Sequence, residues 1–488
     1  MLINKTKLFS LSSLVILSVL AFVTTNFIVM GQRLPWLDED FTLFLISQSW
    51  SDFWYIVTIR EMNMSLYYVS LKIWSLLSMN HFYLRTLSVI YALFAALFVY
   101  KLTKTISTKN TAKVAVIICL LNVIFLRYAH ELRGYSLFAL TTLISIYYCF
   151  QALKENTHNS WILFTLSCVF LFYSHMLAAI IVTAQFLLLL WVLSKPDYLK
   201  IAISALVIWI CIFPLFNQLI QLGGSPVSWA QTISIRSGFK LATDLVVSPF
   251  LTSNLIRLAF ISLVAVLFVF ANKATNSDNK KRNHLLILIV LFALIFAGLA
   301  SFMPIMSSRF ASNLVPMLIV FTALGFMTIN NLAVRATIAV GFLAVFTVSA
   351  VSLFNKQGDD WEQLERIVTE NCLSNEQEKS LIAYYKPSAL IGLSRVKGMI
   401  EKRCPTISFV TSFEPKELYH EDSPHLPDDI SIIPSNYQQI WLIEYYVPGE
   451  TSERYIELEQ EVAEQFSYRQ EFQINSNANM VKLHRFFN

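Results

Sequence analysis

Long apolar runs separated by short polar stretches fill the first 354 residues of the chain. A helix needs about 20 apolar residues to cross a bilayer, so this pattern predicts a polytopic α-helical membrane protein with about 11 transmembrane helices. The run around residues 173–175 is either two short tilted helices or one long helix with a break. The expected spans are 9–30, 84–102, 112–127, 135–152, 161–173, 175–194, 201–222, 252–271, 285–303, 311–329 and 335–354.

The first apolar run follows a basic start, as in a secretory signal peptide. It continues for about 22 residues without a small-x-small cleavage site, which favours a retained span over a removed peptide.

Two longer segments between spans are too polar to cross a membrane. Residues 31–83 are rich in aromatic side chains and contain a helical stretch with Lys72 and Ser75 on one face and Ile73 and Leu77 on the other. This pattern predicts an amphipathic helix in the membrane plane. The second segment, near 223–250, starts with Gly-Gly-Ser-Pro and is expected to begin as a loop.

Residues 355–488 form a separate polar tail in which expected helices alternate with expected strands. The helices are WEQLERIVTENC, PSALIGLSRVKGMIEK and TSERYIELEQEVAEQF, and the strands are KSLIAYY, TISFVTS, QIWLIEYYV and NMVKLHRFF. Such alternation predicts a small α/β domain. The tail has no G-x-G-x-x-G or P-loop pattern.

Composition and charge agree with this two-part organisation: residues 1–354 form the membrane domain and residues 355–488 a domain of their own. The chain is 56% hydrophobic and only 14% charged; residues 1–354 hold 24 Lys+Arg and 10 Asp+Glu, whereas residues 355–488 hold 13 and 22. These values exclude a disordered chain, a small disulfide scaffold and a single-span receptor. We expect contact with membrane lipids and none with nucleic acid.

Loop lysines predict the orientation. They precede the first span and fill the connections between spans two and three and between spans eight and nine, at Lys5, Lys7, Lys101, Lys104, Lys109, Lys113, Lys273, Lys280 and Lys281. The positive-inside rule places these loops and the N-terminus in the cytoplasm. Eleven crossings of the cell (inner) membrane then leave the tail extracytoplasmic.

The cysteines support an outward tail. Cys372 and Cys404 are the two in polar sequence, and we expect them to form a disulfide there, with a pair of buried thiols as the alternative. The remaining four lie in apolar runs, where cysteine packs as a small hydrophobe: Cys119, Cys149, Cys168 and Cys211. No CxxC or HExxH pattern supports a zinc site.

Asp38, Glu39 and Asp40 follow the first span and Pro35. Acids favour the first turn of a helix, so one interpretation is a helix start. Three consecutive carboxylates exceed what a helix start requires, and a base beside a membrane-bound substrate is the functional alternative.

A second charged cluster, RYAHELRGYS, contains Arg127, Glu131 and Arg133. These residues either form ion pairs in a tight hairpin or leave positive charge that can hold a phosphate. Arg309, at the end of the tenth span, either snorkels to the interface or extends the same basic rim. His175 is either a hydrogen-bonded histidine between helices or part of a substrate pocket.

These segments together resemble the GT-C glycosyltransferases. The resemblance rests on the DE pair after the first span, R-x-x-S at Arg85 and Ser88, AHELRGYSL, YSHM and SRFASNLVP, in this order. Within that class the chain is most similar to the protein O-mannosyltransferases and the bacterial aminoarabinose transferases of lipid A. The resemblance covers roughly residues 1–354 and extends weakly into DDWEQLERIV.

The resemblance implies a polyprenyl-phosphate sugar donor and assigns roles to several residues. Asp38 is the expected catalytic base, and Glu39 falls on the family's second acid. The resemblance, together with the basic rim, gives Arg133, Arg309 and Arg85 as donor phosphate ligands and Tyr135, His175 and Glu131 as substrate-pocket residues. Many relatives carry HPPLYY where this chain has NMSLYY at residues 63–68, so nothing about the acceptor or a metal follows from that histidine.

The chemistry of these residues fits the transfer of a sugar. A sugar on a lipid phosphate already has a good leaving group, so the enzyme needs positive charge on the phosphate and a carboxylate for the acceptor's proton. One carboxylate acting as base implies inversion, by analogy with glycoside hydrolysis. We expect no certain cofactor, with a divalent cation as a possibility, and a lipid, protein or polysaccharide acceptor. The alternatives are a lipid or oligosaccharide transporter, although no internal repeat is evident, and a membrane-tethered binding protein.

Overall fold

The computed structural model divides the chain into two compact units, Met1–Gly31 with Glu61–Phe354, and Gln32–Arg60 with Asn355–Asn488. We refer to them as the membrane unit and the C-terminal unit. The structure describes residues 10–59, 61–194, 197–221, 233–250, 253–275, 277–354, 358–373, 379–384, 392–393, 395–409, 437–445, 459–460, 462–474 and 481–488.

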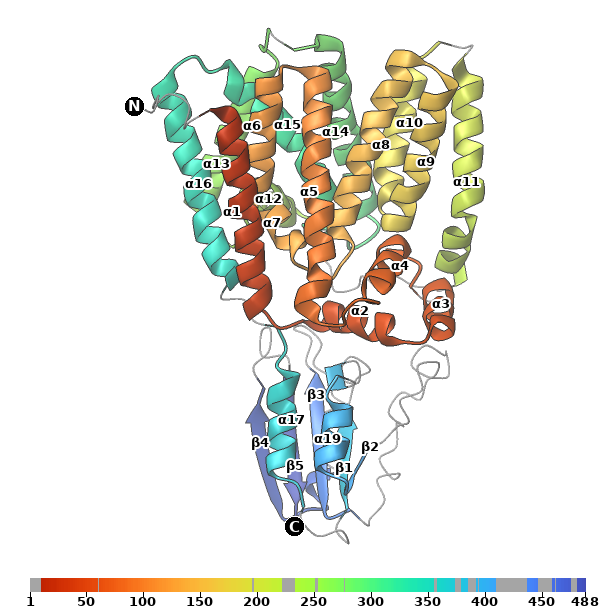
Figure 1. The fold of residues 1–488 in the computed structure, drawn as a ribbon, viewed down its shortest axis with the longest axis vertical. Coiled ribbons are helices and arrows are strands. Elements are labelled where there is room, and N and C mark those ends of the chain that lie inside the picture. Colours follow the sequence, from red (N-terminus) through yellow and green to blue (C-terminus); the bar gives the residue numbers. More distant parts are fainter. Residues whose placement is uncertain are drawn as a thin grey trace. The chain divides into compact units, whose positions relative to one another are not determined.

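The membrane unit is a bundle of helices (Figure 1). They are α1 (Leu11–Gln32), α4 (Ser65–Trp74), α5 (His81–Ile106), α6 (Lys109–Leu120), α7 (Val123–Ala129), α8 (Tyr135–Glu155), α9 (His158–Ser174), α10 (Ala178–Val192), α11 (Tyr198–Gln221), α12 (Ile235–Val246), α13 (Asn254–Ala271), α14 (Asn279–Ala300), η3 (Ser312–Leu314), α15 (Val315–Thr328) and α16 (Leu332–Phe354).

Each of the eleven expected spans coincides with a helix or, for 112–127, with the pair α6 and α7, which bends by 63° at residues 121–122. Within the described residues, seven helices are long and apolar enough to cross a membrane, or eight with the bent pair. The others are shorter, such as α10 with 15 residues, so the count of eleven crossings stays a prediction. The helical conformation is interrupted at residues 175–177, between α9 and α10, which confirms the interpretation as two helices.

Three polar loops meet at one end of the bundle. Lys113 Nζ donates to Ser12 Oγ at 2.8 Å, Lys281 Nζ donates to the Thr105 carbonyl at 3.1 Å, and the Asp278 amide donates to the Ile106 carbonyl at 2.7 Å. The predicted common side of the lysine loops is therefore present in the fold. We call it the lysine end, and the opposite end, which holds residues 130–134 between α7 and α8, the hairpin end.

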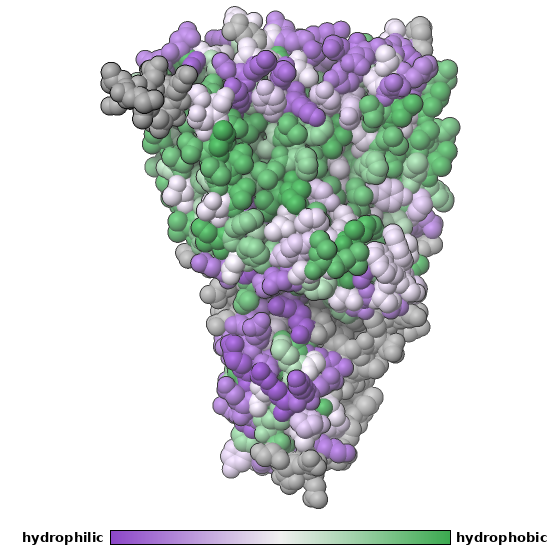
Figure 2. Space-filling view, in the orientation of Figure 1, coloured by the Kyte–Doolittle hydropathy of each residue, from purple (hydrophilic) through white to green (hydrophobic). Residues whose placement is uncertain are grey.

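Apolar side chains form a broad exposed belt across the face of the bundle that Figure 2 shows. On α11, for example, Leu206 and Ile210 are exposed. The short helix α4 and the turn that follows it are amphipathic, as expected. Lys72 and Ser75 are buried, whereas Ile73 and Leu77 are exposed, Leu77 to 79%. A helix of this kind can rest its apolar face on lipid.

The C-terminal unit contains a five-stranded sheet in the order β2-β1-β3-β5-β4. β1 pairs in parallel with β2 and β3, and β5 pairs antiparallel with β3 and β4. Its elements are α2 (Leu37–Ser47), α3 (Trp50–Ile59), α17 (Trp361–Glu370), β1 (Ser380–Tyr384), α19 (Lys397–Arg403), β2 (Ile407–Phe409), β3 (Gln439–Tyr445), β4 (Tyr468–Gln473) and β5 (Val481–Phe487).

Both faces of the sheet are buried. Side chains alternate along a strand, so β3 places Trp441 and Ile443 in a core with α17 and α19, and Ile440 and Leu442 in a second core with Val462. Two buried faces explain why β3 reads as a nearly continuous apolar run. The predicted α/β layer is confirmed, while the expected helices at 387–402 and 451–466 lie partly outside the described residues.

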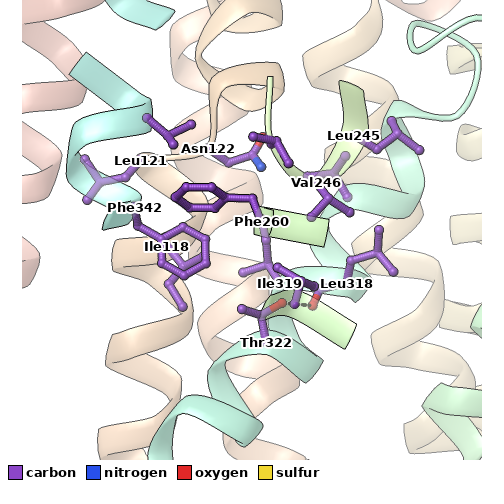
Figure 3. Close-up of a pocket in the computed structure, with 14 residues that line it drawn as sticks. Ile118, Leu121, Asn122, Leu245, Val246, Phe260, Leu318, Ile319, Thr322 and Phe342 are labelled. Carbon is purple, nitrogen blue, oxygen red and sulfur yellow. Dashed lines mark hydrogen bonds between the residues drawn. The ribbon is translucent and has the colours of Figure 1, made fainter. Parts of the chain in front are cut away.

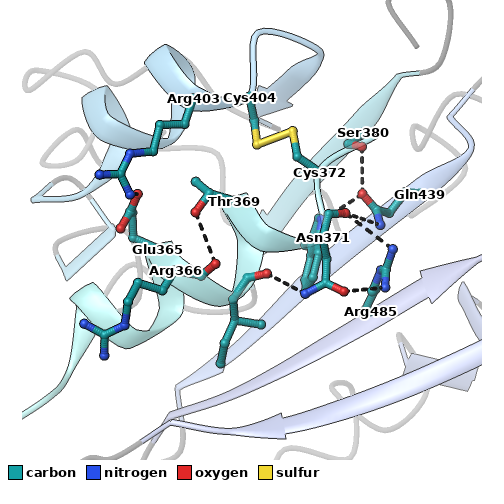
Figure 4. The surroundings of a disulfide bond; sticks show 12 residues. Glu365, Arg366, Thr369, Asn371, Cys372, Ser380, Arg403, Cys404, Gln439 and Arg485 are labelled. Atoms are coloured by element: carbon teal, nitrogen blue, oxygen red, sulfur yellow. Dashed lines mark hydrogen bonds and ion pairs between the residues drawn. A yellow bond between two sulfur atoms is a disulfide. The ribbon is translucent and has the colours of Figure 1, made fainter. Parts of the chain in front are cut away.

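Strand β4 was not expected from the sequence. It is one of the two edge strands, and its side chains are almost all exposed, so it lacks the apolar alternation that identifies a half-buried strand. In the structure, a disulfide between Cys372 and Cys404 joins the segment after α17 to the segment after α19 (Figure 4).

Candidate functional site

The hairpin end is built around the turn that joins α7 to α8. Arg127 Nε lies 3.2 Å from Glu131 Oε1, and Glu131 is only 1% exposed. Ser136 Oγ closes the turn by donating to the Tyr128 carbonyl at 2.8 Å. Arg127 and Glu131, four residues apart, thus form the ion pair that one interpretation of this cluster expected.

Arg133 contacts the polar segment 31–83 between the first two expected spans. Its Nη1 donates to the hydroxyl of the buried Tyr68 at 2.8 Å, and its guanidinium lies 5.9 Å from the centre of the Tyr68 ring. The neighbouring Gly134 explains the close approach, because a Cβ there would lie 3.2 Å from Tyr67 Cβ and 3.3 Å from Met64 Cβ. Met64 itself has a left-handed backbone with φ of 64°. The NMSLYY segment, which stands where many relatives carry HPPLYY, therefore packs directly against the hairpin that is predicted to bind phosphate.

His175 is buried in an aromatic cluster at the break between α9 and α10. Its ring stacks on Phe138 at 4.7 Å, lies 6.1 Å from Tyr135 and meets Phe310 edge-on at 6.2 Å. Its Nδ1 accepts the Leu177 amide at 3.2 Å. In a neutral ring, Nε2 then carries the proton and is a donor, and it has no hydrogen-bond partner within the described residues.

One hydrogen bond and two electrostatic interactions connect these elements. Asn63 Oδ1 accepts the Met176 amide at 3.0 Å, which ties the NMSLYY segment to the α9–α10 break. The charge of Arg133 acts on His175, and that of Arg309 acts on Tyr128. The structure therefore gathers Arg133, His175 and Arg309 in one region.

Arg309 precedes the short helix that leads into α15. Ser312 Oγ donates to its carbonyl at 3.0 Å, and Pro316 occupies the first turn of α15, where a missing N–H costs nothing. Arg309 is partly exposed, whereas the adjacent Phe310 is buried against His175.

Arg85 has a different environment. It is fully buried on α5, and its Nη1 donates to the Met30 carbonyl of α1 at 3.4 Å. Ser88, one turn on, contacts the hairpin by donating to the Glu131 carbonyl at 2.8 Å and pairs with the Tyr67 hydroxyl at 3.0 Å. Tyr67, Tyr68 and Asn63 were not among the expected site residues, although two adjacent tyrosines in the polar segment 31–83 were a usable signal.

The acidic run lies in the C-terminal unit, in the first turn of α2. The helix-start interpretation is correct as to position. Asp38 is partly exposed, Glu39 is fully buried 3.6 Å from Arg33 Nη2, and Asp40 is 1% exposed with Arg395 Nη1 at 2.8 Å. Burial raises the pKa of Asp40 to about 7, although Arg395 opposes the shift.

A pocket in the membrane unit lies among α6, α12, α13, α15 and α16 (Figure 3). Its lining is aliphatic or aromatic except for Asn122 and Thr322, so it suits a hydrocarbon and offers no charge for a phosphate. Asn122 also caps α7 by accepting the Phe125 amide at 3.1 Å. Within the described ranges, no group of three or more His, Cys, Asp or Glu side chains could hold a metal ion.

Comparison with known proteins identifies the fold. ArnT from Cupriavidus metallidurans in the apo state matches with a TM-score of 0.59 at 10% identity, over 96% of this chain and 97% of that chain. The same protein bound to undecaprenyl phosphate matches with a TM-score of 0.57 at 11% identity and the same coverage. No protein family matches the sequence, and no curated protein matches it.

ArnT is the lipid A aminoarabinose transferase, a GT-C glycosyltransferase. The chain therefore has the GT-C fold over almost its whole length, which confirms the resemblance. At this identity the likeness establishes the fold alone.

Proposed function

We propose that the protein is a membrane glycosyltransferase that moves a sugar from a polyprenyl-phosphate donor to an extracytoplasmic acceptor. The observation that carries this proposal is the grouping of Arg133, Arg309 and His175 at the hairpin end of a GT-C fold. ArnT, the protein with the similar fold, binds undecaprenyl phosphate.

In this proposal the acceptor oxygen attacks the anomeric carbon as the bond from that carbon to the phosphate oxygen breaks. Asp38 takes the proton from the acceptor hydroxyl. Arg133 and Arg309 stabilise the charge that develops on the departing polyprenyl phosphate. A single displacement inverts the anomeric centre.

The positions of the other candidate residues refine their roles. His175 Nε2 is suited to donate to a sugar or phosphate oxygen. Glu131 acts through Arg127, its ion-pair partner, and Tyr135 contributes part of the aromatic wall around His175. Arg85 donates to a backbone carbonyl between α1 and α5, which supports a positioning role more than direct phosphate binding.

The lysine end faces the cytoplasm in this proposal, and the hairpin end and residues 355–488 are outside the cell membrane. The lysine loops meet at one end of the bundle, and the disulfide suits an oxidising compartment. Cysteines introduced at Thr105 and Asp278 should resist an impermeant thiol reagent in intact cells. Labelling of either one from outside would contradict this orientation.

The function is tested with the purified full-length protein in lipid nanodiscs. A set of radiolabelled polyprenyl-phosphate sugars is supplied with envelope extract as acceptor, and the release of polyprenyl phosphate is measured. We expect release by the wild type and not by Asp38→Asn. A donor that is moved between leaflets of a proteoliposome but stays intact would indicate the transporter alternative instead.

A further inference from the structure

The third carboxylate of the acidic run, Asp40, anchors α2 to the part of the C-terminal unit formed by residues 355–488, which we call the C-terminal domain. Asp40 Oδ1 accepts Arg395 Nη1 at 2.8 Å, and Asp40 Oδ2 accepts Trp361 Nε1 at 3.2 Å. Both carboxylate oxygens are therefore engaged by residues that follow Asp40 by more than 300 positions in the chain. An acid held in this way is poorly placed to act as a base.

Backbone contacts reinforce this anchor. The Asp359 amide donates to the Pro35 carbonyl at 2.9 Å. A Cβ at Gly358 would lie 2.1 Å from the Leu34 carbonyl oxygen, so only glycine permits that approach. Leu37, in the first turn of α2, packs against the same core as Trp361. The start of α2 is thus fixed at several points on the C-terminal domain.

The anchor also determines how Asp38 is presented. Successive residues of an α-helix are about 100° apart, so Asp38 and Asp40 point about 200° apart around α2. Asp40 is buried against Arg395 and Trp361, and Asp38 is partly exposed on the other side of the helix. A rotation of α2 about its axis would move the Asp38 carboxylate.

We propose that Arg395 and Trp361 are positioning residues, which hold Asp40 and thereby orient Asp38 for the transfer reaction. This inference rests on the proposed function, in which Asp38 is the base. It gives the C-terminal domain a part in catalysis through α2. It also assigns the three adjacent acids separate tasks, with Asp40 as the anchor.

The experiment compares four variants of the full-length protein in nanodiscs. Arg395→Gln removes the charge and the fork, Arg395→Lys keeps the charge, and Arg403→Gln is the matched control. Arg403 also forms an ion pair within the domain, with Glu365 at 2.9 Å, but Glu365 lies on α17 rather than α2. Trp361→Phe, which deletes the donor N–H and leaves Arg395 in place, is the fourth variant; because Trp361 is a buried core residue, its folded fraction is measured first.

We expect Arg395→Gln to lower kcat per folded molecule by at least about tenfold, since small misplacements of a reacting group have effects of this size. The KM for the donor should stay within about twofold of wild type. Arg395→Lys should recover part of the loss, and Arg403→Gln should behave as wild type. Normal kcat in both Arg395→Gln and Trp361→Phe would overturn the proposal.

A second measurement does not depend on activity. Amide hydrogen exchange over residues 37–47 should become faster in Arg395→Gln but not in Arg403→Gln, because the anchor of α2 is lost. If no variant, including the wild type, transfers sugar, the proposed function fails while the exchange result still tests the anchor. Unchanged exchange in Arg395→Gln would overturn the anchor itself.

Discussion

Removing the disulfide should loosen the part of the C-terminal unit that holds α2. Cys372 and Cys404 are 32 residues apart in sequence, and closing a loop of that length stabilises a fold by about 3.7 kcal/mol in the chain-entropy treatment. For a unit of about 160 residues, the corresponding drop in Tm is about 11 °C. We expect this drop in the double variant Cys372→Ser, Cys404→Ser.

We also expect removal of the disulfide to affect activity, because of where the bond lies in the C-terminal unit. It fastens the end of α17 to the end of α19 (Figure 4). Trp361 is the first residue of α17, and Arg395 lies two residues before α19. The same end of α17 is held by Asn371, whose Oδ1 accepts Arg485 Nη1 at 2.9 Å. We therefore expect the domain to stay folded at 25 °C but to lose activity at a lower temperature than the wild type.

The assay is thermal unfolding followed by tryptophan fluorescence, with and without dithiothreitol. Reductant should lower the Tm of the wild type toward that of the double variant and leave the double variant unchanged. Cys211→Ser is the control, because Cys211 lies on α11 in the membrane unit. Alkylation of both tail cysteines in unreduced protein, or a Tm shift below about 2 °C, would refute the reasoning.

Three other predictions concern the acidic run and the hairpin end. Asp38→Asn should lower turnover by about 10² to 10⁴ without unfolding the protein, whereas Asp52→Asn, in the first turn of α3, should leave it unchanged; near-normal turnover in Asp38→Asn removes the base. Arg133→Lys and Arg309→Lys should each lose about 10²-fold in kcat, because lysine keeps the charge but not the planar fork, and full activity per folded molecule in both would remove the phosphate site. Burial raises the pKa of Asp40 to about 7, so ionisation of Asp40 lowers the free energy of unfolding as pH rises from about 4 to 7 and has no further effect above that range. Asp40→Asn should therefore remove a difference on the order of 4 kcal/mol in the free energy of chemical unfolding between pH 4 and pH 8. An unchanged pH dependence in this variant would contradict the burial argument.

The sequence predicted the helical bundle well because lipid imposes a strong pattern. Every backbone polar group in a membrane must be satisfied within the helix, so spans appear as uninterrupted apolar runs. The bend between α6 and α7 and the helix α12 were not predicted. Asn122 and Ser234 start α7 and α12 as N-caps, and such signals are weak beside the apolar pattern around them.

The candidate site was predictable in composition but not in its pairings. Sequence alone could not decide whether Glu131 pairs with Arg127 or Arg133, because both spacings are short. The structure shows the i,i+4 pair with Arg127 and a bond from Arg133 to Tyr68. Likewise, Arg395 follows Asp40 by 355 positions, and no local pattern indicates a contact over that distance.

Long-range pairing also changes how the acidic run is understood. Three carboxylates in one helical turn repel one another, and burial of two of them without counter-charges would be costly. Arg33 lies beside Glu39 and Arg395 beside Asp40, so the run with its two arginines carries a net charge of −1 rather than −3. The hairpin segment 127–136, with two arginines and one glutamate, carries +1. A displacement at a sugar phosphate needs one negative group to accept a proton and positive charge to stabilise the leaving group. Once the ion pairs are counted, the acidic run keeps one negative charge and the hairpin segment keeps one positive charge, as this reaction requires. We therefore assign the base to Asp38 and not to the acid triplet as a whole.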